Sequence, residues 1–334
     1  MKKIFQKFIG YHRYAHLAQL KLMYANFHKD LQLYKKYSTV FDAESFENKE
    51  AQIILAYHSL EKGFLFSEMK PNFGKTRVAQ LNKLLNDPEV INNAKKSQIN
   101  VAYQVMCRYY ELHVQQHFNT EDYFPEKYYL NYKKILAEDY STEFEGIIKY
   151  NREAFYKNND KPFDLFAKSR KSIRNFTGEK ISQNLIEEAI KLASTAPSVC
   201  NRQASRVYLV EDKIKIDQIL KIQGGMKGYT EGISQLLILT NDRNYYYTIG
   251  ERNQFYIDGG LFLMNLLYAL HFYEIAACPA NWGKRIDEEE KLQQFVTLPE
   301  SEKIICMIPI GIATDDFSVC LSKRRDYDEI LTIN

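Results

Sequence analysis

Two short stretches decide the fold of this 334-residue chain: residues 169–176, SRKSIRNF, and residues 196–203, APSVCNRQ. The first gathers Arg170, Lys171 and Arg174 with two serine hydroxyls, which is the density of charge and hydrogen-bond donors that a phosphate needs. The second combines small residues with two side-chain amides, which can hydrogen-bond a flat heterocycle rich in carbonyls and ring nitrogens. Together the two stretches indicate a phosphorylated cofactor.

The sequence around these stretches alternates helical and strand-like patterns, as an α+β fold does. Ser182 can cap a helix that ends near residue 194, and a second, long helix is expected at 252–273. Apolar runs bounded by turn residues predict strands at 206–211, 234–240 and 304–313.

The N-terminal half differs in glycine content and in the spacing of its apolar residues. Only four of the 14 glycines precede residue 161, and the apolar residues there recur with helical spacing. Helices are expected at 12–36, 45–60, 76–85, 91–117 and 140–157. The polar stretch KNNDKP at 157–162 is the expected linker, so we predict a helical domain at 1–160 and a second domain at 161–334.

The composition is that of a folded protein, with 45% apolar and 26% charged residues. The longest apolar stretches, of about ten residues, are half of what a membrane-spanning helix needs. Residues Gln6 and Lys7 interrupt the first apolar run, so no secretion signal is expected. The five cysteines lack paired spacing, which argues against a disulfide framework or a thiolate zinc site and favours a reducing cytoplasm. No nucleic-acid partner is expected.

Residues 1–40 carry eight basic side chains and one acid, Asp30. Apolar residues recur there every three or four positions, as in a helix with one apolar face. Such a helix can lie on an anionic membrane surface or pack on the rest of the protein. We favour packing on the protein, because several tyrosines enlarge the apolar face; peripheral membrane contact is the alternative.

The two opening stretches, the helix with Asp258-Gly259-Gly260, the PIGIA segment at 309–313 and the closing RRDYDEI at 324–330 occur in the same order as in the nitroreductase family of flavoproteins. The chain resembles that family over about residues 165–332. The resemblance implies an α+β fold, a central mixed sheet flanked by helices, which binds FMN and usually forms its sites at a homodimer interface. It also implies an oxidoreductase that takes hydride from NADH or NADPH and reduces a small-molecule acceptor.

The same resemblance implies roles for individual residues. Arg170 and Arg324 would hold the FMN phosphate, and Ser172 would bond to the phosphate or the ribityl chain; Lys171, between Arg170 and Ser172 in sequence, is a further expected cofactor contact. Arg174 would face the ring edge that becomes negative on reduction, where a fixed cation is stabilising. The remaining expected contacts are Ser198, Asn201 and Gln203 in the second stretch, Lys227, Asn281, Trp282 and Gly283 in two loops, and Ser322 in the SKRR segment. Met226 stands where many relatives have a polar ring contact, and Lys227 is its expected replacement. The alternative for Trp282 is a core or interface anchor.

The helical N-terminal half contains fewer sequence motifs that indicate a function. HSLEKG at 58–63 resembles a segment of long nitroreductase-like proteins associated with surface-polysaccharide synthesis. His58 and Glu61 have the spacing of a metal or acid–base pair, but a capping or core role is favoured. The pairs His12 with His16 and His113 with His117 have ligand spacing but no third ligand nearby in sequence, so no metal site is expected.

The favoured function is therefore an FMN-dependent NAD(P)H oxidoreductase, and the HSLEKG resemblance suggests surface-polysaccharide metabolism as its setting. Two alternatives stay open. One is a flavin oxidase of a larger substrate, such as a peptide or a lipid-linked sugar. The other is a non-catalytic flavin-fold component of a glycan-assembly complex.

Overall fold

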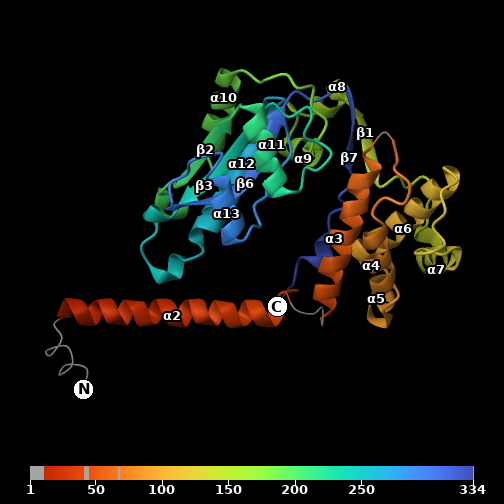
Figure 1. Cartoon of the computed structure of the whole chain (residues 1–334), viewed down its shortest axis with the longest axis horizontal. Helices are drawn as coiled ribbons and strands as arrows, with labels where there is room; N and C mark the ends of the chain where they lie inside the picture. The colour runs from red at the N-terminus through yellow and green to blue at the C-terminus, as the bar shows by residue number, and fades with distance from the viewer. Residues whose placement is uncertain (1–10, 41–44, 67, 334) are drawn as a thin grey trace. The chain divides into compact units, whose positions relative to one another are not determined.

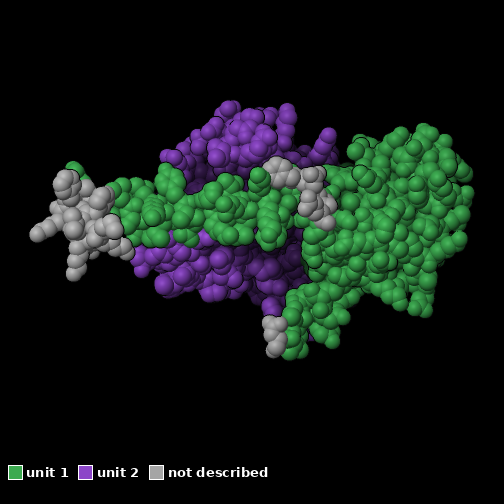
Figure 2. Space-filling view, turned by 90° about the horizontal axis from the view of Figure 1, so that it is seen from below, with its two compact units in different colours: residues 1–148, 320–334 green, residues 149–319 purple. Residues whose placement is uncertain are grey.

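A computed structural model describes residues 11–40, 45–66 and 68–333 (Figure 1). The chain forms two compact units, shown in different colours in Figure 2: unit 1 comprises residues 1–148 and 320–334, and unit 2 comprises residues 149–319. The division at residue 148 precedes the expected linker at 157–162. The closing segment, which we expected in the second domain, belongs to unit 1.

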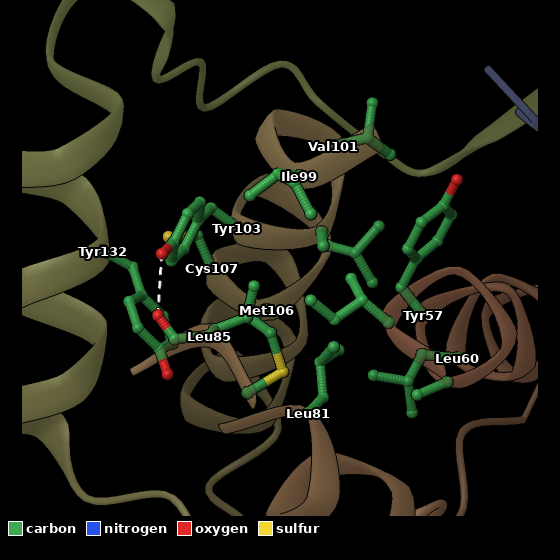
Figure 3. Packing of buried hydrophobic residues seen from close by; sticks show 14 of the residues in the cluster. Tyr57, Leu60, Leu81, Leu85, Ile99, Val101, Tyr103, Met106, Cys107 and Tyr132 are labelled. Atoms are coloured by element: carbon green, nitrogen blue, oxygen red, sulfur yellow. Dashed lines mark hydrogen bonds between the residues drawn. The ribbon is translucent and has the colours of Figure 1, made fainter. Parts of the chain in front are cut away.

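Unit 1 is helical. Its helices pack around a core of buried aliphatic and aromatic residues, in which the Tyr103 hydroxyl donates a hydrogen bond to the carbonyl of Leu85 at 2.7 Å (Figure 3). A buried phenol needs such a partner. The helices are α2 (Tyr11–Tyr37), α3 (Phe46–Phe64), α4 (Lys75–Leu85), α5 (Pro88–Asn92), α6 (Ser97–Gln115) and α7 (Glu126–Leu136), with a 3-10 turn η1 (Ala137–Asp139) after α7 and another, η5 (Tyr327–Glu329), in the closing segment.

Before residue 160, three of the helical assignments differ from the sequence prediction. The helix expected at 91–117 is divided into α5 and α6, and α7 was not predicted. The expected helix at 140–157 is wrong: Gly146, at φ 71°, leads into strand β1 (Ile147–Asn151), which is followed by the short helix α8 (Arg152–Tyr156). A glycine at positive φ ends helical geometry at little cost, and this outweighs the helical spacing around it.

Helix α2 confirms a helix in the basic N-terminal segment; residues 1–10 lie outside the described residues. Between residues 12 and 37 no residue is buried, and large apolar side chains such as Tyr24, Leu31 and Tyr34 are more than 60% exposed. Within unit 1 this apolar face is therefore uncovered, and its expected packing on the rest of the protein stays a prediction.

The closing segment is tied to unit 1 by polar contacts. The Arg325 guanidinium bonds both oxygens of buried Glu50, at 3.0 and 2.7 Å, and also the carboxylate of Glu329. The amide of Ser97 donates to Glu329 at 2.7 Å, and Gln98 donates to the carbonyl of Lys323 at 3.2 Å. These bonds explain why residues 320–334 separate from the rest of the predicted second domain.

Unit 2 contains the alternating helices and strands that were expected. After α9 (Phe163–Ser169), helix α10 (Gln183–Ala193) begins at the predicted cap, where the Ser182 hydroxyl accepts from the amide of Leu185. The other helices are α11 (Lys213–Gln223), α12 (Gln254–Phe272) and α13 (Ile286–Leu292), with 3-10 turns η2 (Val199–Asn201), η3 (Arg243–Tyr245) and η4 (Ile249–Glu251). The strands are β2 (Ser205–Val210), β3 (Gln235–Asp242), β4 (Ala276–Ala277), β5 (Ala280–Asn281), β6 (Glu302–Gly311) and β7 (Asp316–Cys320).

Strands β2, β3, β6 and β4 form one sheet in that order, and β5 also pairs with β6; β1 and β7 form a separate two-stranded sheet. The expectation of a sheet flanked by helices is confirmed (Figure 1). It differs in one respect, because the pairings of the five-stranded sheet are all antiparallel rather than mixed.

Helix α12 forms the core of unit 2. By length and composition it could span a membrane, but Leu266, Leu267 and Leu270 are buried against sheet residues such as Ile308, as in the core helix of a globular protein. Gly259 permits this packing: a Cβ there would lie 2.6 Å from the Ile305 side chain. The site described below is built around this helix.

Candidate cofactor-binding site

The APSVCNRQ segment forms the tight connection between α10 and β2. Three of its non-glycine residues have positive φ: Cys200 at 47°, Asn201 at 54° and Gln203 at 51°. Side chains with a Cβ adopt this region rarely, and a run of such residues is a cost that folds retain mainly at binding and catalytic sites. The loop fixes itself locally, since Ser198 Oγ accepts from the Gln203 amide at 3.0 Å and Gln203 Nε2 donates to Asn201 Oδ1 at 3.0 Å.

Asp258, near the start of α12, anchors this loop. Its carboxylate is 3% exposed and accepts from the Val199 amide at 3.2 Å, from the Tyr246 hydroxyl at 3.1 Å and from Gln254 Nε2 at 2.8 Å. Hydrogen bonds to a buried charged group are among the strong ones in proteins. Asp258 thereby connects the loop to α12 and to Tyr246, the residue after η3.

A cavity of about 270 Å³ lies between the loop, α10, β2 and α12. Its polar wall carries the predicted residues Ser198 and Gln203 together with Arg206, whose guanidinium is held by the Tyr245 hydroxyl at 2.7 Å. Its apolar wall is lined by Ile190, Val207 and Phe262. A cavity with one hydrogen-bonding and one apolar wall suits a flat heterocycle.

The SRKSIRNF segment runs extended beside β4. Ile173 is buried and its amide donates to the carbonyl of Ala277 at 3.0 Å, whereas Ser172 and Arg174 on either side are partly exposed. Arg170 and Lys171 line a small pocket with Leu267 and His271 from the second half of α12. The two cations of the predicted phosphate site therefore do lie together.

His271 is the unpredicted member of this pocket. It is buried among Phe155, Tyr156 and Phe166, and its Nε2 lies 2.8 Å from Ser169 Oγ. Since the Ser169 hydroxyl donates to the carbonyl of Phe166 at 2.7 Å, His271 Nε2 is the donor of that pair. Burial, and next the Arg170 charge, lower the pKa of His271 to about 4, so the ring is neutral beside the cations at physiological pH.

The two predicted stretches occupy different halves of α12. The loop 196–203 lies with Asp258 and Phe262, and the segment 170–174 with Leu267 and His271. Asp258 and His271 are thirteen positions apart, which is about 20 Å along a helix. Within the described part of one chain, the residues predicted to bind the phosphate and those predicted to bind the ring therefore line separate cavities.

The loops with Asn281 and Lys227 meet. Gln223 Nε2 donates to the carbonyl of Asn281 at 3.0 Å, and its Oε1 accepts from the Gly225 amide at 2.6 Å. Met226 is 1% exposed, so this departure from the family pattern fills the core, while Lys227 and Gly283 are exposed. The Trp282 indole is buried and its Nε1 donates to Glu289 Oε1 at 2.9 Å, which suits the alternative of a core anchor; the predicted flavin contact of residues 281–283 stays a prediction.

Ser322 and Arg324 belong to unit 1. Arg324 is exposed and donates to the carbonyl of Ser322 at 3.2 Å, and Ser322 has a positive φ of 46°. Their part in phosphate binding stays a prediction.

Arg206, Tyr246 and His271 were not predicted, and Asp258 was noted only as part of a motif. No local pattern marks Arg206 or His271, because each acts through neighbours distant in sequence. A buried-type helix that contains a lone aspartate was a usable signal for Asp258, since a buried carboxylate needs several donors.

Comparison with known proteins finds a family match over part of this site. Residues 167–227 match the model of the nitroreductase family, a range that contains both opening stretches and Lys227. The predicted resemblance is thus confirmed for this segment of unit 2.

Two similar proteins are iodotyrosine deiodinases. The one from Hydra vulgaris is 22% identical over 247 residues, which cover 66% of this chain and 85% of that protein. Iodotyrosine deiodinase 1 from Mus musculus is 24% identical over 194 residues, 48% of this chain and 66% of that protein.

Solved structures of nitroreductase type are also similar. A nitroreductase family protein from Streptococcus pneumoniae matches 52% of this chain and all of its own, with 17% identity and a TM-score of 0.46. A nitroreductase from Desulfovibrio desulfuricans, solved in complex with FMN, matches 52% of this chain and 98% of its own, with 23% identity and a TM-score of 0.44.

Proposed function

We propose that this protein is an FMN-dependent oxidoreductase that uses NADH or NADPH to reduce a small-molecule acceptor. One observation carries the proposal. Residues 167–227, which match the family model, contain both the loop 196–203 beside a cavity with a polar and an apolar wall and, separately, the cations Arg170 and Lys171. FMN has both chemical halves: a flat ring with hydrogen-bond acceptors and a phosphate dianion.

The residues present fit the two halves of FMN. Arg170 and Lys171 would hold the phosphate through charge-assisted hydrogen bonds. His271, kept neutral by burial, adds no third charge and fixes Ser169 next to Arg170. Ser198, Gln203 and the anchored Arg206 guanidinium would meet polar ring atoms.

When bound, FMN supplies a ring that accepts two electrons as hydride and passes them to a second substrate. The chain's own contribution is binding and electrostatics. Arg174, partly exposed on the extended segment, would stabilise negative charge at the ring edge. Asp258 would hold the 196–203 loop in its strained form, so that the polar wall is set before the ligand arrives.

A homodimer completes the proposal. Because the two sets of residues lie at different halves of α12, one FMN can meet both sets if its phosphate is held by one copy of the chain and its ring by the other. The expected dimer of the family suits this division of the site.

Anaerobic reduction tests the function. Purified protein loaded with FMN should lose its visible flavin absorption on addition of NADH or NADPH and regain it when an acceptor such as a quinone or a nitroaromatic is added. Flavin that binds but is reduced by neither nucleotide would favour the non-catalytic alternative. Reoxidation by oxygen alone, at the full rate of turnover, would favour the oxidase.

A second candidate reaction is reductive removal of halogen from an aromatic substrate. It is favoured by the match of 66% of this chain to a deiodinase. Iodotyrosine in place of the quinone, with release of iodide as the readout, separates it from the first. A role in polysaccharide metabolism stays a prediction from HSLEKG.

A further inference from the structure

His58, Glu61 and Cys320 meet in unit 1, although the first two lie on α3 and the third is the last residue of β7. One ring nitrogen of His58, one carboxylate oxygen of Glu61 and Cys320 Sγ all lie within 4.8 Å of one another. Glu61 is fully buried, Cys320 is 4% exposed and forms no disulfide, and the His58 side chain is 35% exposed. Among the described residues this is the only group of three such side chains with this closeness.

We propose that these three residues bind one zinc-type divalent cation. Imidazole nitrogen, carboxylate oxygen and thiolate sulfur are the three donor types that zinc accepts, and one of each leaves a fourth position of the tetrahedron for water or another ligand. The partly exposed His58 ring gives the ion a route from solvent.

The geometry needs little change to accept the ion. His58 Nδ1 and Glu61 Oε2 are 2.9 Å apart. Tetrahedral bonds of about 2 Å would set a nitrogen and an oxygen ligand about 3.3 Å apart, and a nitrogen and a sulfur ligand about 3.6 Å apart. The widest separation in the cluster must therefore close by about 1 Å, which side-chain rotation can supply.

A backbone contact orients the carboxylate for this role. The Ser322 amide donates to Glu61 Oε1 at 3.3 Å, so the other oxygen, Oε2, is directed at His58. Ser322 adopts a positive φ of 46° where it makes this contact. Contacts of this kind fix the ligands of metal sites.

Charge balance also favours a cation. A buried carboxylate requires compensation, and a thiolate beside it would add a second negative charge. One divalent cation neutralises both. Without metal, the His58–Glu61 contact can serve as an ion pair while Cys320 stays a thiol; that simpler state is the competing outcome of the test.

Cobalt is the probe, because a Co²⁺–thiolate bond gives a charge-transfer absorption and a tetrahedral site gives strong visible bands. We expect the reduced full-length protein to bind one Co²⁺ per chain with both signals, read as difference spectra against the metal-free sample, and Zn²⁺ to remove them. Cys320→Ala should lose the charge-transfer band, and His58→Gln should weaken Co²⁺ binding at least tenfold. Cys200→Ala, which removes an exposed thiol of unit 2, is the matched control and should keep both signals.

Circular dichroism and the melting temperature of each metal-free variant show whether it is folded. If Cys320→Ala does not fold, His58→Gln carries the test, since its side chain is partly exposed. Absence of saturable Co²⁺ binding by the wild-type chain would overturn the proposal and leave a simple ion pair. So would full charge-transfer absorption in Cys320→Ala, or unchanged affinity in His58→Gln.

Discussion

Asp258 shows how one side chain positions the candidate site, since its carboxylate bonds the 196–203 loop, Tyr246 and α12. Asp258→Ala should leave buried donors without an acceptor, at a cost of about 1–3 kcal/mol in the free energy of unfolding of unit 2. We also expect faster hydrogen exchange at the Val199 amide. Asp217→Ala, which removes an exposed carboxylate paired with Lys213 on α11, is the control.

If Asp258→Ala left both the exchange at Val199 and the stability at wild-type values, the loop would be held by its own internal bonds. The stability of each variant can be measured by urea unfolding followed by tryptophan fluorescence. Because Trp282 is the chain's only tryptophan and lies in unit 2, this fluorescence reports the unfolding of that unit.

His271 predicts a dependence of stability on pH. In the unfolded chain its pKa is about 6.5, whereas burial keeps the folded pKa at about 4. As the pH falls through this window the unfolded state takes up the proton first, so the free energy of unfolding should fall by up to about 3 kcal/mol. Stability from this residue is thus present above pH 6.5 and lost towards pH 4.

His271→Phe should remove that part of the dependence in urea unfolding followed by Trp282 fluorescence at pH 7.5 and 4.5. Burial lowers the pKa of His113 too, but His113 lies in unit 1 and is present in both proteins. A variant with the same pH dependence as wild type would show that His271 titrates normally.

Local sequence signals were enough to name some of the residues that line the two cavities. Clustered cations and amides are local signals, so Arg170, Lys171, Ser198 and Gln203 could be named in advance. The pocket around His271 could not, because its members come from four segments that only the fold brings together.

At the scale of the element, α12 offers two adjacent glycines in opposite environments. A Cβ at Gly259 would lie 2.6 Å from Ile305, whereas a Cβ at Gly260 meets nothing within 4 Å. Gly259→Ala should destabilise unit 2 by about 1–3 kcal/mol through overpacking against β6. Gly260→Ala should stabilise it by up to about 1 kcal/mol, because alanine is the better helix former.

Urea unfolding followed by Trp282 fluorescence compares the two glycine variants directly. Equal effects of the same sign would mean that α12 does not approach β6 as closely as described.

Elements with strong periodicity or caps could be predicted from the sequence, as α10 with its Ser182 cap and β3 with its apolar run illustrate. β1 could not be predicted, because the apolar residues at 140–157 have helical spacing. The positive φ of Gly146, which ends helical geometry there, is known only from the structure. β4 and β5, of two residues each, are too short for any periodic signal.

At the scale of the whole molecule, α2 carries an apolar face that the rest of unit 1 leaves uncovered. Because none of its described side chains is buried, deleting residues 1–40 should leave the melting temperature of the protein unchanged and raise its solubility. A fall in the melting temperature of the deletion variant would support the expected packing of this segment on the rest of the protein. Loss of a salt-sensitive affinity for anionic vesicles, without that fall, would instead support membrane contact.

The assignment of the closing segment was likewise beyond sequence reasoning. RRDYDEI follows β7 in sequence, and contacts that appear only in the fold, such as the pairing of Arg325 with the buried Glu50, tie it to the helical unit.

Titration of flavin-free protein with FMN tests the central claim most directly. We expect saturable binding with the visible spectrum of bound flavin, at an affinity roughly tenfold to a hundredfold weaker in Arg170→Ala, which loses a charge-assisted bond to the phosphate. Arg285→Ala removes an exposed arginine of unit 2 that bonds Asp287, and it should bind FMN like wild type. A chain that cannot be loaded with FMN, or an Arg170→Ala variant with wild-type affinity, would contradict the account.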